Sequence, residues 1–539
     1  MFHRSHPRSP LVGAVLVSTL LFITSALTPR TPSSTTHAAS ATTTMTIVLT
    51  EEPDSLDPQK SDTAVSDQVL RYVGDPLIYL APNGQFVPGL ATHYSVSTDG
   101  LLYQFVLRSG VTFQDGTPLT ADAYVKTFQR ALAPSTKSPL AGGLLGAVTS
   151  IKTTGPLRFS IRLKHPYAFF LHNLSDAGRL MPLSPTALHK EGSSFGRRPV
   201  STGPWMVSSW KSGSQITLVR NPHYTWGPSF VQHGPPSIGT LAFRIITDEA
   251  TQTAAFQSGE VDELALPAPA VARIEAANTY QIKRYLRQGV GLFMEFNVLK
   301  APFNDVRVRQ ALNDAINKTA VLQIGIQGLG QPAYGVLPPS IAGYWPGIAT
   351  YRYSYNQQKA LALLGQAGWT MKNGVLQKNG HPFTFTLINA PIDSWKRSAL
   401  VVQAQLKSIG IQMNIQSYEF GTALSKEAAG DQQADFMGYT YSTADILYLW
   451  FDSSQIGTGL ANSHDRDPHL DALIAQMRAS VDATKRAAVI AQIQRYIADQ
   501  ALWVPLWNNS VYLAFQPRVR GFMLDPEGNV ILNNAHLTS

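Results

Sequence analysis

A dense group of possible metal ligands lies at residues 464–471. Its members are His464, Asp465, Asp467, His469 and Asp471. Imidazole and carboxylate groups bind divalent cations, but this spacing matches no fixed ligand pattern such as H-E-x-x-H. Asp467-Pro468 instead has the composition of a helix start, with the aspartate as N-cap and the proline at the first helical position. We therefore predict a capped helix here and no metal site.

Two arginines, Arg307 and Arg309, have the chemistry to bind a phosphate. They lie in a predicted helix, and we favour ion pairs that hold this helix in place as their role. The sequence contains no G-x-x-x-x-G-K-[ST] loop, which binds nucleotide phosphates in one large class of ATPases. We predict that the chain is not an enzyme and carries no cofactor.

The elements that must position a binding group are clearest in residues 90–134. Tyr103, Phe105 and Leu107 recur at every second position, which predicts a strand with one strongly apolar face. Asp-Gly turns flank this strand. Thr120 is placed as the N-cap of a helix that Pro134 ends. By itself this pattern predicts a compact α+β unit.

The same segment carries a resemblance to a known family. It is similar to the signature Y-x-x-S-x-D-G-x-x-Y-x-F-x-L-R-x-x-V-x-F-x-D-G-x-P-x-T-A-x-D of the family 5 extracellular solute-binding proteins, the oligopeptide- and dipeptide-binding components of ABC importers. The matching positions are Tyr94, Ser97, Asp99, Gly100, Tyr103, Phe105, Leu107, Arg108, Val111, Phe113, Asp115, Gly116, Pro118, Thr120, Ala121 and Asp122. Residues 296–312, FNVLKAPFNDVRVRQAL, give a second match. The resemblance covers almost all of residues 46–530.

The resemblance implies an α/β fold with two lobes, of the periplasmic-binding-protein type (type II, cluster C), with a hinge and an extra subdomain on lobe one. Residues 383–418 read as strand, helix and strand, which predicts a βαβ unit with parallel strands. The expected boundaries are 45–295 for lobe one, 80–200 for its extra subdomain, 296–505 for lobe two and 506–539 for the return to lobe one. Two crossings, near 296 and 505, would form a hinge that closes around a ligand.

The resemblance also implies where a ligand binds. Residues 434–445, ADFMGYTYSTAD, are similar to the family's A-D-x-x-x-x-G-W-x-A-D-Y-P-D-P, in which the first Asp of A-D-Y pairs with a peptide's α-ammonium. Ser442 occupies that position, and a serine cannot neutralise a buried cation. Either Glu295 or Asp445 takes this role, or the ligand has no free amine. The predicted ligand-binding residues are Phe293, Glu295, Phe420, Tyr439, Thr440, Tyr441, Ser442 and Asp445. Core packing explains the aromatic members Phe293, Tyr439 and Tyr441 equally well.

Composition limits the class of protein. The 539 residues exceed what one core usually holds, and 44% hydrophobic with 14% charged residues is typical of a folded globular chain. The net charge of +8 is not gathered into long Lys/Arg runs, so we expect no nucleic-acid partner. Cysteine is absent, which excludes disulfides and a lipid-modified cysteine.

Residues 1–44 predict a secretory signal or a membrane anchor, followed by a Ser/Thr-rich linker. Arg4 and Arg8 precede an apolar run of 17 residues at 11–27, and Ala39-Ser40-Ala41 offers a cleavage site. An uncleaved anchor also fits the length of this run. Both interpretations place the folded body outside the cytoplasm.

Together these observations predict an extracytoplasmic solute-binding protein, in the periplasm or on the outer face of the cell membrane. It would capture a peptide or similar small solute and deliver it to an ABC permease, with ATP hydrolysed by another subunit. We expect a monomer, associated with the membrane through its transporter or an uncleaved N-terminus. The alternatives are a secreted hydrolase on the same scaffold, a binding protein for a non-peptide solute such as a glycan or metal chelate, and a surface chemoreceptor. Ligand identity, signal cleavage and the partner permease stay open.

Overall fold

A computed structural model describes residues 43–457 and 459–538. The signal or anchor predicted over residues 1–44 lies outside the described residues, apart from its last two positions. Among the described helices, none combines the length and the apolar composition that crossing a membrane requires.

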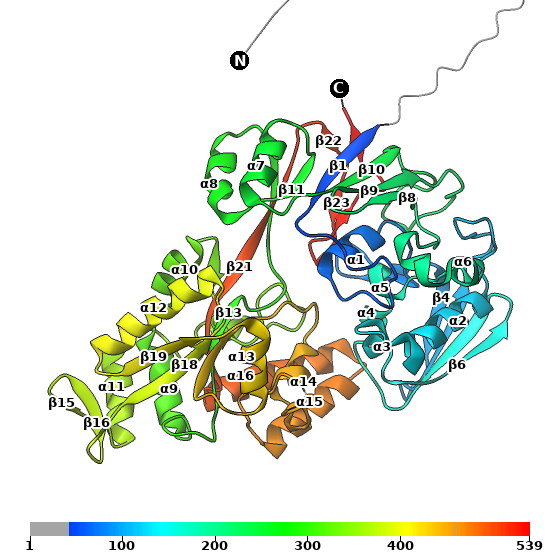
Figure 1. Cartoon of the computed structure of the whole chain (residues 1–539). Helices are drawn as coiled ribbons and strands as arrows, with labels where there is room; N and C mark the ends of the chain where they lie inside the picture. The colour runs from blue at the N-terminus through cyan, green and yellow to red at the C-terminus, as the bar shows by residue number, and fades with distance from the viewer. Residues whose placement is uncertain (1–42, 458, 539) are drawn as a thin grey trace, which may run out of the picture. The chain divides into compact units, whose positions relative to one another are not determined.

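One long strand, β21 (Trp503–Phe515), runs through two parts of the structure (Figure 1). Its first half pairs antiparallel with β13 (Leu292–Phe296), and its second half with β11 (Glu263–Ala265) and β12 (Gln281–Leu286). β21 thereby joins twelve strands into one sheet, in the order β19-β18-β20-β13-β21-β11-β1-β10-β9-β8, with β12 and β14 paired to β21 off this path. Both ends of β21 are buried, but residues 509–511 between them are only half-buried.

We call the two parts lobe one (residues 43–286 and 510–538) and lobe two (residues 292–508). The chain passes between them at residues 287–291 and again within β21. The crossings expected near 296 and 505 lie a few residues from these passages, and Phe293 pairs directly with Pro505. The strand that follows the first passage, β13, is therefore the neighbour in the sheet of β21, which makes the second passage.

The bounds of the elements follow from their hydrogen bonding. Lobe one contains β1 (Thr44–Leu49), α1 (Ala64–Leu70), β2 (Ile78–Leu80), β3 (Phe86–Pro88), β4 (Ala91–Val96), β5 (Leu102–Leu107), α2 (Ala121–Leu132), α3 (Ala141–Leu144), β6 (Val148–Gly155), β7 (Arg158–Leu163), α4 (Phe170–Asn173), α5 (Ala177–Leu180), α6 (Pro185–Glu191), β8 (Trp205–Lys211), β9 (Gln215–Arg220), β10 (Thr240–Ile245), α7 (Glu249–Gln257), α8 (Ala268–Ala276), β22 (Val519–Arg520), β23 (Met523–Leu524), β24 (Val530–Ile531) and β25 (His536–Leu537), besides β11 and β12. Lobe two contains α9 (Val306–Ala315), α10 (Lys318–Ile326), β14 (Gly330–Pro332), α11 (Gln357–Gln366), β15 (Thr370–Lys372), β16 (Val375–Lys378), β17 (His381–Pro382), β18 (Thr384–Asn389), α12 (Asp393–Ser408), β19 (Gln412–Ser417), α13 (Phe420–Ala428), β20 (Ala434–Met437), α14 (Ile446–Phe451), α15 (Pro468–Ala479) and α16 (Ala483–Gln500), besides β13.

The segment that carries the family signature folds as the sequence predicts. β5 is the strand with the apolar face, and Tyr103, Phe105 and Leu107 are all buried. It lies in a four-stranded antiparallel sheet, β4-β5-β7-β6, on which α2 packs. The Thr120 side chain accepts a hydrogen bond from the Ala123 N–H and so caps α2. Alternation and capping are local effects, and this is why they were readable in advance.

Lobe two contains the predicted βαβ unit: β18 and β19 are parallel, and α12 connects them. Sequence alone left Asn304 and Asp305 as alternative caps of this helix; Asp305 caps α9 and forms an ion pair with Arg307 at 2.7 Å. Arg309 differs from the expectation, since its guanidinium donates to the carbonyl oxygens of Phe303 and Gln500 rather than to a carboxylate. Both arginines therefore hold the helix in place.

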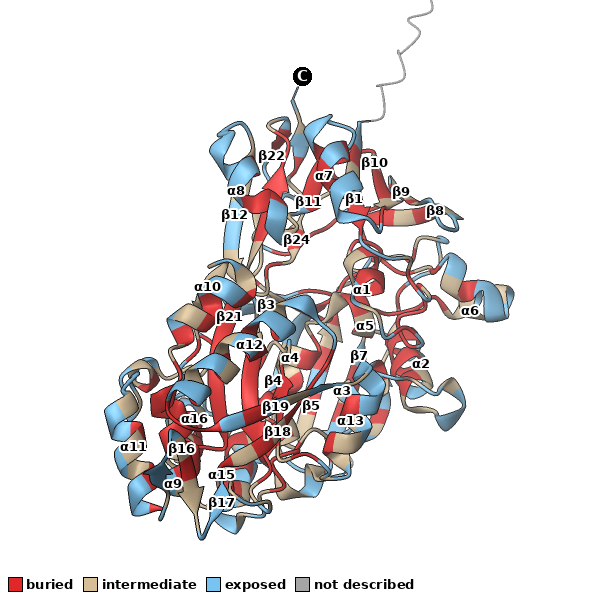
Figure 2. Cartoon of the chain, turned by 60° about the vertical axis from the view of Figure 1, so that its left-hand side comes forward, coloured by how far each residue is buried: buried red, intermediate tan, exposed pale blue. Residues whose placement is uncertain are grey.

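The buried residues follow the strands of the sheets and the inner faces of the helices (Figure 2). Between β7 and α5, only α4, at Phe170–Asn173, is helical. The residues before it, 164–169, form a loop with a turn at Ala168 and Phe169, and this loop contacts lobe two, as described below.

Candidate functional site

A cavity of about 810 Å³ lies between the two lobes. This volume falls within the roughly 300–1,000 Å³ of small-molecule sites. Its walls combine the early part of lobe one, the return segment after β21 and the stretch that follows β20. The polar lobe-one residues of the wall include Asp67, Arg71, Tyr79, Tyr167, His172, Asp176, Arg179, Asp525 and Glu527. Lobe two contributes Thr440, Tyr441, Ser442, Thr443, Asp445, Tyr448, Leu449 and Arg478.

The lobe-two wall is fixed to the passage between the lobes. The backbone N–H groups of Tyr439 and Tyr441 donate to the carbonyl oxygens of Val290 and Gln288, at 2.9 and 2.8 Å. Gly289 lies between these two acceptors with φ of 143°, and a Cβ there would come within 1.9 Å of the Tyr439 carbonyl oxygen. Only glycine fits such a close backbone approach. The residues after Tyr439 are therefore held against the passage and move with it.

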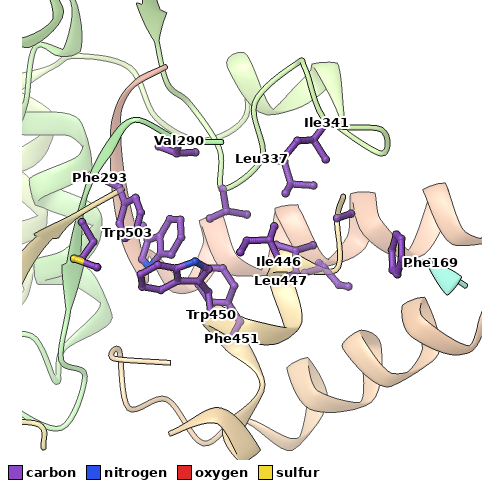
Figure 3. Close-up of a cluster of buried hydrophobic side chains, with 14 of the residues drawn as sticks. Phe169, Val290, Phe293, Leu337, Ile341, Ile446, Leu447, Trp450, Phe451 and Trp503 are labelled. Atoms are coloured by element: carbon purple, nitrogen blue, oxygen red, sulfur yellow. The ribbon is translucent and has the colours of Figure 1, made fainter. Parts of the chain in front are cut away.

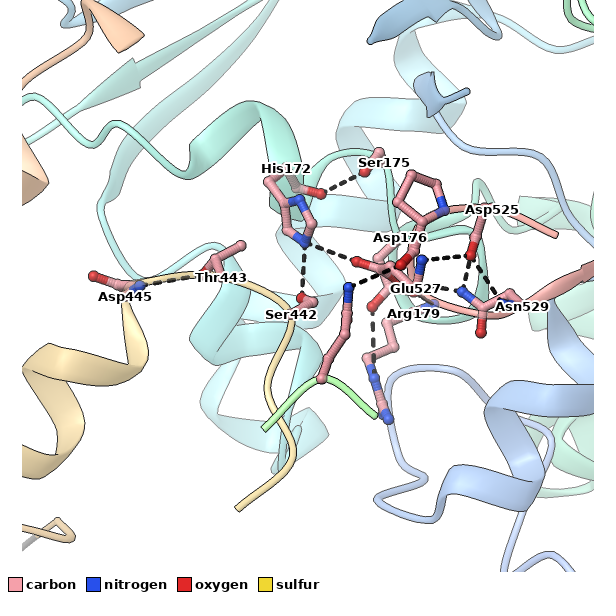
Figure 4. Close-up of polar contacts among 12 residues, drawn as sticks. His172, Ser175, Asp176, Arg179, Ser442, Thr443, Asp445, Asp525, Glu527 and Asn529 are labelled. Carbon is pink, nitrogen blue, oxygen red and sulfur yellow. Dashed lines mark hydrogen bonds and ion pairs between the residues drawn. The ribbon is translucent and has the colours of Figure 1, made fainter. Parts of the chain in front are cut away.

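His172 joins the two lobes across the cavity (Figure 4). Its Nε2 lies 2.8 Å from the Ser442 Oγ of lobe two and 3.1 Å from the Glu527 Oε1 of lobe one. Both contacts use the same ring nitrogen. A catalytic relay instead needs the nucleophile and the orienting carboxylate on opposite nitrogens of the ring. This arrangement links the lobes and does not activate the serine.

Asp445 is the most enclosed carboxylate of the cavity wall. Its Oδ2 accepts a hydrogen bond from the Tyr167 hydroxyl at 2.7 Å, and its Oδ1 accepts one from the Arg478 Nε at 2.8 Å. Burial raises the pKa of Asp445, against the opposing effects of Arg478 and Tyr167. Both oxygens thus have protein partners from the two lobes.

Further carboxylates gather at the lobe-one end of the cavity. Arg71 forms an ion pair with Asp67, and Arg179 forms one with Asp176 at 3.6 Å. Burial, followed by the neighbouring charge of Asp67, raises the pKa of Asp176 to about 7. Asp176 therefore changes its charge near neutral pH, beside the cavity.

Asp525 lies in the return segment beside this group (Figure 4). Its Oδ1 accepts from the backbone N–H groups of Glu527 and Asn529, and its Oδ2 accepts from the Asn529 side-chain amide at 2.8 Å. Within the described part of the chain, no basic side chain forms an ion pair with it. Burial raises the pKa of Asp525, and the nearby Arg71 opposes this.

The cavity wall carries more acidic than basic groups. Its carboxyl groups belong to Asp67, Asp176, Asp445, Asp525 and Glu527, and its guanidinium groups to Arg71, Arg179 and Arg478. His172 adds a positive charge only when protonated. Even with Asp176 half-protonated the acidic groups remain in excess, so the cavity favours a cation over an anion.

The structure brings four of the predicted ligand-binding residues to the cavity: Thr440, Tyr441, Ser442 and Asp445. Three others lie elsewhere. The Tyr439 hydroxyl donates to the Val336 carbonyl oxygen at 2.7 Å, beneath the wall. Phe293 is fully buried and stacks on Trp503, with ring centroids 3.5 Å apart (Figure 3). Phe420 is 43% exposed at the start of α13.

Glu295 also does not line the cavity. It lies opposite Asp435 on the neighbouring strand β20, and neither carboxyl has a hydrogen-bond partner within 3.5 Å among the described residues. Burial, followed by the neighbouring carboxyls, raises the pKa of Asp435 well above its ordinary value. Burial also raises the pKa of Glu295; the nearby Trp503 lowers this pKa and the charge of Glu427 raises it. This pair belongs to the interior of lobe two and cannot serve a solute in the cavity.

Sequence reasoning missed the lobe-one wall altogether. Asp67, His172, Asp176 and Glu527 lie in unrelated stretches with no shared motif. The one available signal was residues 525–529, DPEGN, where two acids stand in a turn-forming sequence.

Two sequence patterns that suggest chemistry form no reactive site in the structure. Asp467 caps α15 by accepting from the His469 and Leu470 N–H groups, as predicted. No cluster of three His, Asp or Glu residues suited to a metal occurs among the described residues. Residues 192–196, GSSFG, also fit the G-x-S-x-G pattern of a nucleophile elbow, which sequence reasoning missed. They form a 3₁₀ helix, Ser194 is exposed, and the segment is outside the cavity wall.

Comparison with known proteins gives consistent matches over most of the chain. The family described as "Bacterial extracellular solute-binding proteins, family 5 Middle" matches residues 85–458. The probable deoxycholate-binding periplasmic protein YgiS of Escherichia coli is 28% identical over 88% of this chain and 89% of its own length. The glutathione-binding protein GsiB of Salmonella paratyphi A is 28% identical over 90% and 92%.

The solved structures agree in architecture. The oligopeptide-binding protein AppA of Bacillus subtilis, in complex with a nonapeptide, superposes with a TM-score of 0.72 at 25% identity, over 92% of this chain and 99% of that one. The fold is thus the two-lobed α/β fold that such proteins share. The names of these relatives give three different ligands, deoxycholate, glutathione and a nonapeptide, so the ligand must be argued from this chain's own cavity.

Proposed function

The chain belongs to the family 5 bacterial extracellular solute-binding proteins, and we propose that its solute is a short peptide or similar small molecule that carries a positive charge. Proteins of this class work outside the cytoplasm and deliver their solute to an ABC transporter. The charge of the solute is the part of this proposal that rests on the present cavity.

The observation that carries the proposal is the excess of carboxylates around the interlobe cavity. A cation that leaves water for such a cavity needs an opposite charge close by. Ser442 supplies none at the position where the resemblance expects an aspartate. Asp445 lines the cavity, but Arg478 already neutralises it. The charge available to a solute therefore comes from the lobe-one end, where Asp525 forms no ion pair among the described residues, although Arg71 is nearby.

The two-walled cavity also supports capture by closure. A solute that touches both lobes binds the closed arrangement more tightly than the open one and so shifts the population towards it. The passages at residues 287–291 and within β21 are the places where the backbone can bend between the lobes. Tyr439 and Tyr441 are hydrogen-bonded to the first passage, which couples the cavity wall to this bending.

The protein works with separate transporter subunits. Since the sequence has no phosphate-binding loop, ATP hydrolysis falls to a separate subunit that works with the permease. We propose a monomer with no nucleic-acid partner and no catalytic activity. The shared nitrogen in the contacts of His172 with Ser442 and Glu527 supports binding over hydrolysis.

The test compares matched solutes that differ only in charge. Native mass spectrometry of protein purified without added solute first shows whether a molecule copurifies, and its mass. Isothermal titration then compares trialanine with N-acetyl-trialanine, and N-acetyl-Ala-Lys-Ala with N-acetyl-trialanine, where every peptide in this and the later tests is a C-terminal amide and so lacks the terminal carboxylate. We expect each cationic peptide to bind about tenfold to a hundredfold more tightly than its neutral partner, as a charge-assisted hydrogen bond implies. Equal binding within both pairs, or tighter binding of the neutral peptide, overturns the proposed charge.

A further inference from the structure

The loop before α4, in the lobe-one subdomain, contacts lobe two. The Ala168 N–H donates to the Arg478 carbonyl oxygen at 2.8 Å, and the Tyr167 hydroxyl donates to Asp445. Residues 164–169 are not helical, and Ala168 and Phe169 lie in a turn before α4. The Ala168 N–H therefore has no helical partner and can bond to the other lobe.

Tyr167, Asp445 and Arg478 form one connected group at the cavity wall. Asp445 accepts from Tyr167 with one oxygen, and from Arg478 with the other. The Arg478 guanidinium lies 3.7 Å from the centre of the Tyr448 ring and 5.2 Å from that of the Tyr167 ring. Aromatic faces attract a guanidinium, so both tyrosines help to hold it in place. We call Tyr167, Asp445 and Arg478 the clasp.

The clasp is largely shielded from water, and this shielding strengthens its hydrogen bonds. Tyr167 is 7% exposed and Asp445 is 4% exposed. Hydrogen bonds to a charged group in such surroundings are stronger than bonds between neutral groups. Opening the lobes separates Tyr167 from Asp445 and leaves the ion pair within lobe two. The hydroxyl bond is therefore gained only on closure.

Apolar contacts reinforce the same junction. Phe169, in the same loop, is 7% exposed and belongs to the buried cluster that includes Ile341 and Leu447 of lobe two (Figure 3). The Arg486 guanidinium lies 5.7 Å from the Phe169 ring centre. Burying an aromatic side chain stabilises the state in which it is buried. Both polar and apolar contacts of this loop thus favour closure.

We propose that the clasp sets the balance between the open and the closed arrangement, whatever solute occupies the cavity. Each clasp contact joins two protein groups, so its contribution to closure needs no solute atom. Asp445, predicted from the family resemblance as a ligand residue, then acts as a positioning residue that holds the second wall in place. Solute affinity depends on this balance, because the apparent Kd equals the intrinsic Kd divided by the fraction of molecules in the binding-competent state.

The first test measures closure without any solute. Because the chain has no cysteine, Lys152→Cys on the subdomain and Thr484→Cys on lobe two, both exposed positions, can be spin-labelled selectively. Double electron–electron resonance then reports the distribution of distances between the two spin labels, one on each lobe. Tyr167→Phe keeps the ring and removes the hydroxyl. We expect the ratio of open to closed molecules to rise about tenfold to a hundredfold.

Tyr124→Phe is the matched control. Tyr124 is also a fully buried tyrosine of the subdomain, but its hydroxyl has no hydrogen-bond partner among the described residues, and its ring packs on Phe128 and Phe159 of the same subdomain. We expect its distance distribution to equal that of the parent protein. Thermal unfolding of both variants checks that the subdomain remains folded. A folded Tyr167→Phe protein with an unchanged distance distribution overturns the clasp.

The second test uses the solute and rests on the proposed function. Titration of trialanine into Tyr167→Phe should give a weaker apparent Kd than in Tyr124→Phe, in proportion to the loss of closed molecules. If the solute class is wrong, neither variant nor the parent binds trialanine, while the distance measurement still shows the opening. A shifted distance distribution with an unchanged Kd in a protein that binds would show that the clasp does not control affinity.

Discussion

Replacing Ser442 by aspartate is the sharpest test of how this cavity recognises charge. Ser442 lines the cavity, and its hydroxyl has His172 as its protein partner. A carboxylate at this position adds a charge-assisted bond to a cationic solute, worth roughly 1.5–3 kcal/mol, or about tenfold to a hundredfold in Kd. Ser442→Asp should therefore tighten the binding of N-acetyl-Ala-Lys-Ala or trialanine by this factor.

The same substitution should destabilise the protein before any solute binds. The new carboxylate would lie near Glu527, because the Ser442 Oγ and the Glu527 Oε1 already contact one nitrogen of His172. Two like charges about 5 Å apart repel by roughly 3 kcal/mol at an effective dielectric constant near 20. Protonation of His172, or a bound cation, offsets this repulsion. Unfolding of the free protein should thus require less urea, and added cationic solute should restore much of the difference.

Isothermal titration and urea unfolding measure the two effects separately. Ser442→Asn serves as the control, since it matches the size of aspartate without its charge, and it should leave the cationic preference unchanged. Weaker binding of the cationic peptide to Ser442→Asp would refute the acidic-cavity reasoning. Unchanged binding in both variants would mean that the solute does not approach this part of the wall.

Three further perturbations follow from individual residues. Affinity for N-acetyl-Ala-Arg-Ala should rise between pH 6 and 8, because Asp176 loses its proton over this range while the guanidinium of the peptide stays charged. Burial and Asp67 raise the pKa of Asp176 to about 7. An equally steep rise in Asp176→Asn would contradict this prediction. Burial, together with Asp262, raises the pKa of Glu263 to about 8, so its contribution to stability is complete below pH 4.5 and is lost as the pH rises to 8. Urea unfolding should therefore show a loss of up to roughly 5 kcal/mol over this range that Glu263→Gln lacks, and parallel pH profiles would disprove it. Gly289→Ala, which would press on the Tyr439 carbonyl, should lower stability by about 1–3 kcal/mol, whereas Gly365→Ala, with open space around it, should not; equal effects would argue against the tight passage.

The sequence by itself determined the local elements and the family. Thr120 and Asp467 were placed as helix caps from their types and positions, and each caps its helix; for α9 the sequence left Asn304 and Asp305 open, and Asp305 is the cap. The βαβ unit of lobe two followed from strand and helix periodicity alone. The caps depend on interactions over three or four residues, and the strands and helix of the βαβ unit on periodicity within each segment, so short windows of sequence contain the physics that decides them.

The residues of the cavity wall were predicted only in part, and for Glu295 and Phe293 the difference has one cause. Glu295 was expected to meet the ligand, but it and Phe293 share the face of β13 that packs against Trp503 inside lobe two. Which face of a strand meets the solvent depends on the neighbouring strands and helices, and a shift by one residue reverses it. Resemblance located the strand but could not give its surroundings.

Only the tertiary structure decided the chemistry between the lobes. Tyr167 meets Asp445 across 278 positions of sequence, and His172 meets Ser442 across 270. Nothing in either partner's local sequence indicates the other, because such contacts are set by how whole lobes fold and close. The same holds for Asp525, which the return of β21 carries back beside the start of lobe one. The acidic cavity and its clasp are therefore properties of the folded chain, although every residue in them is ordinary in its own stretch of sequence.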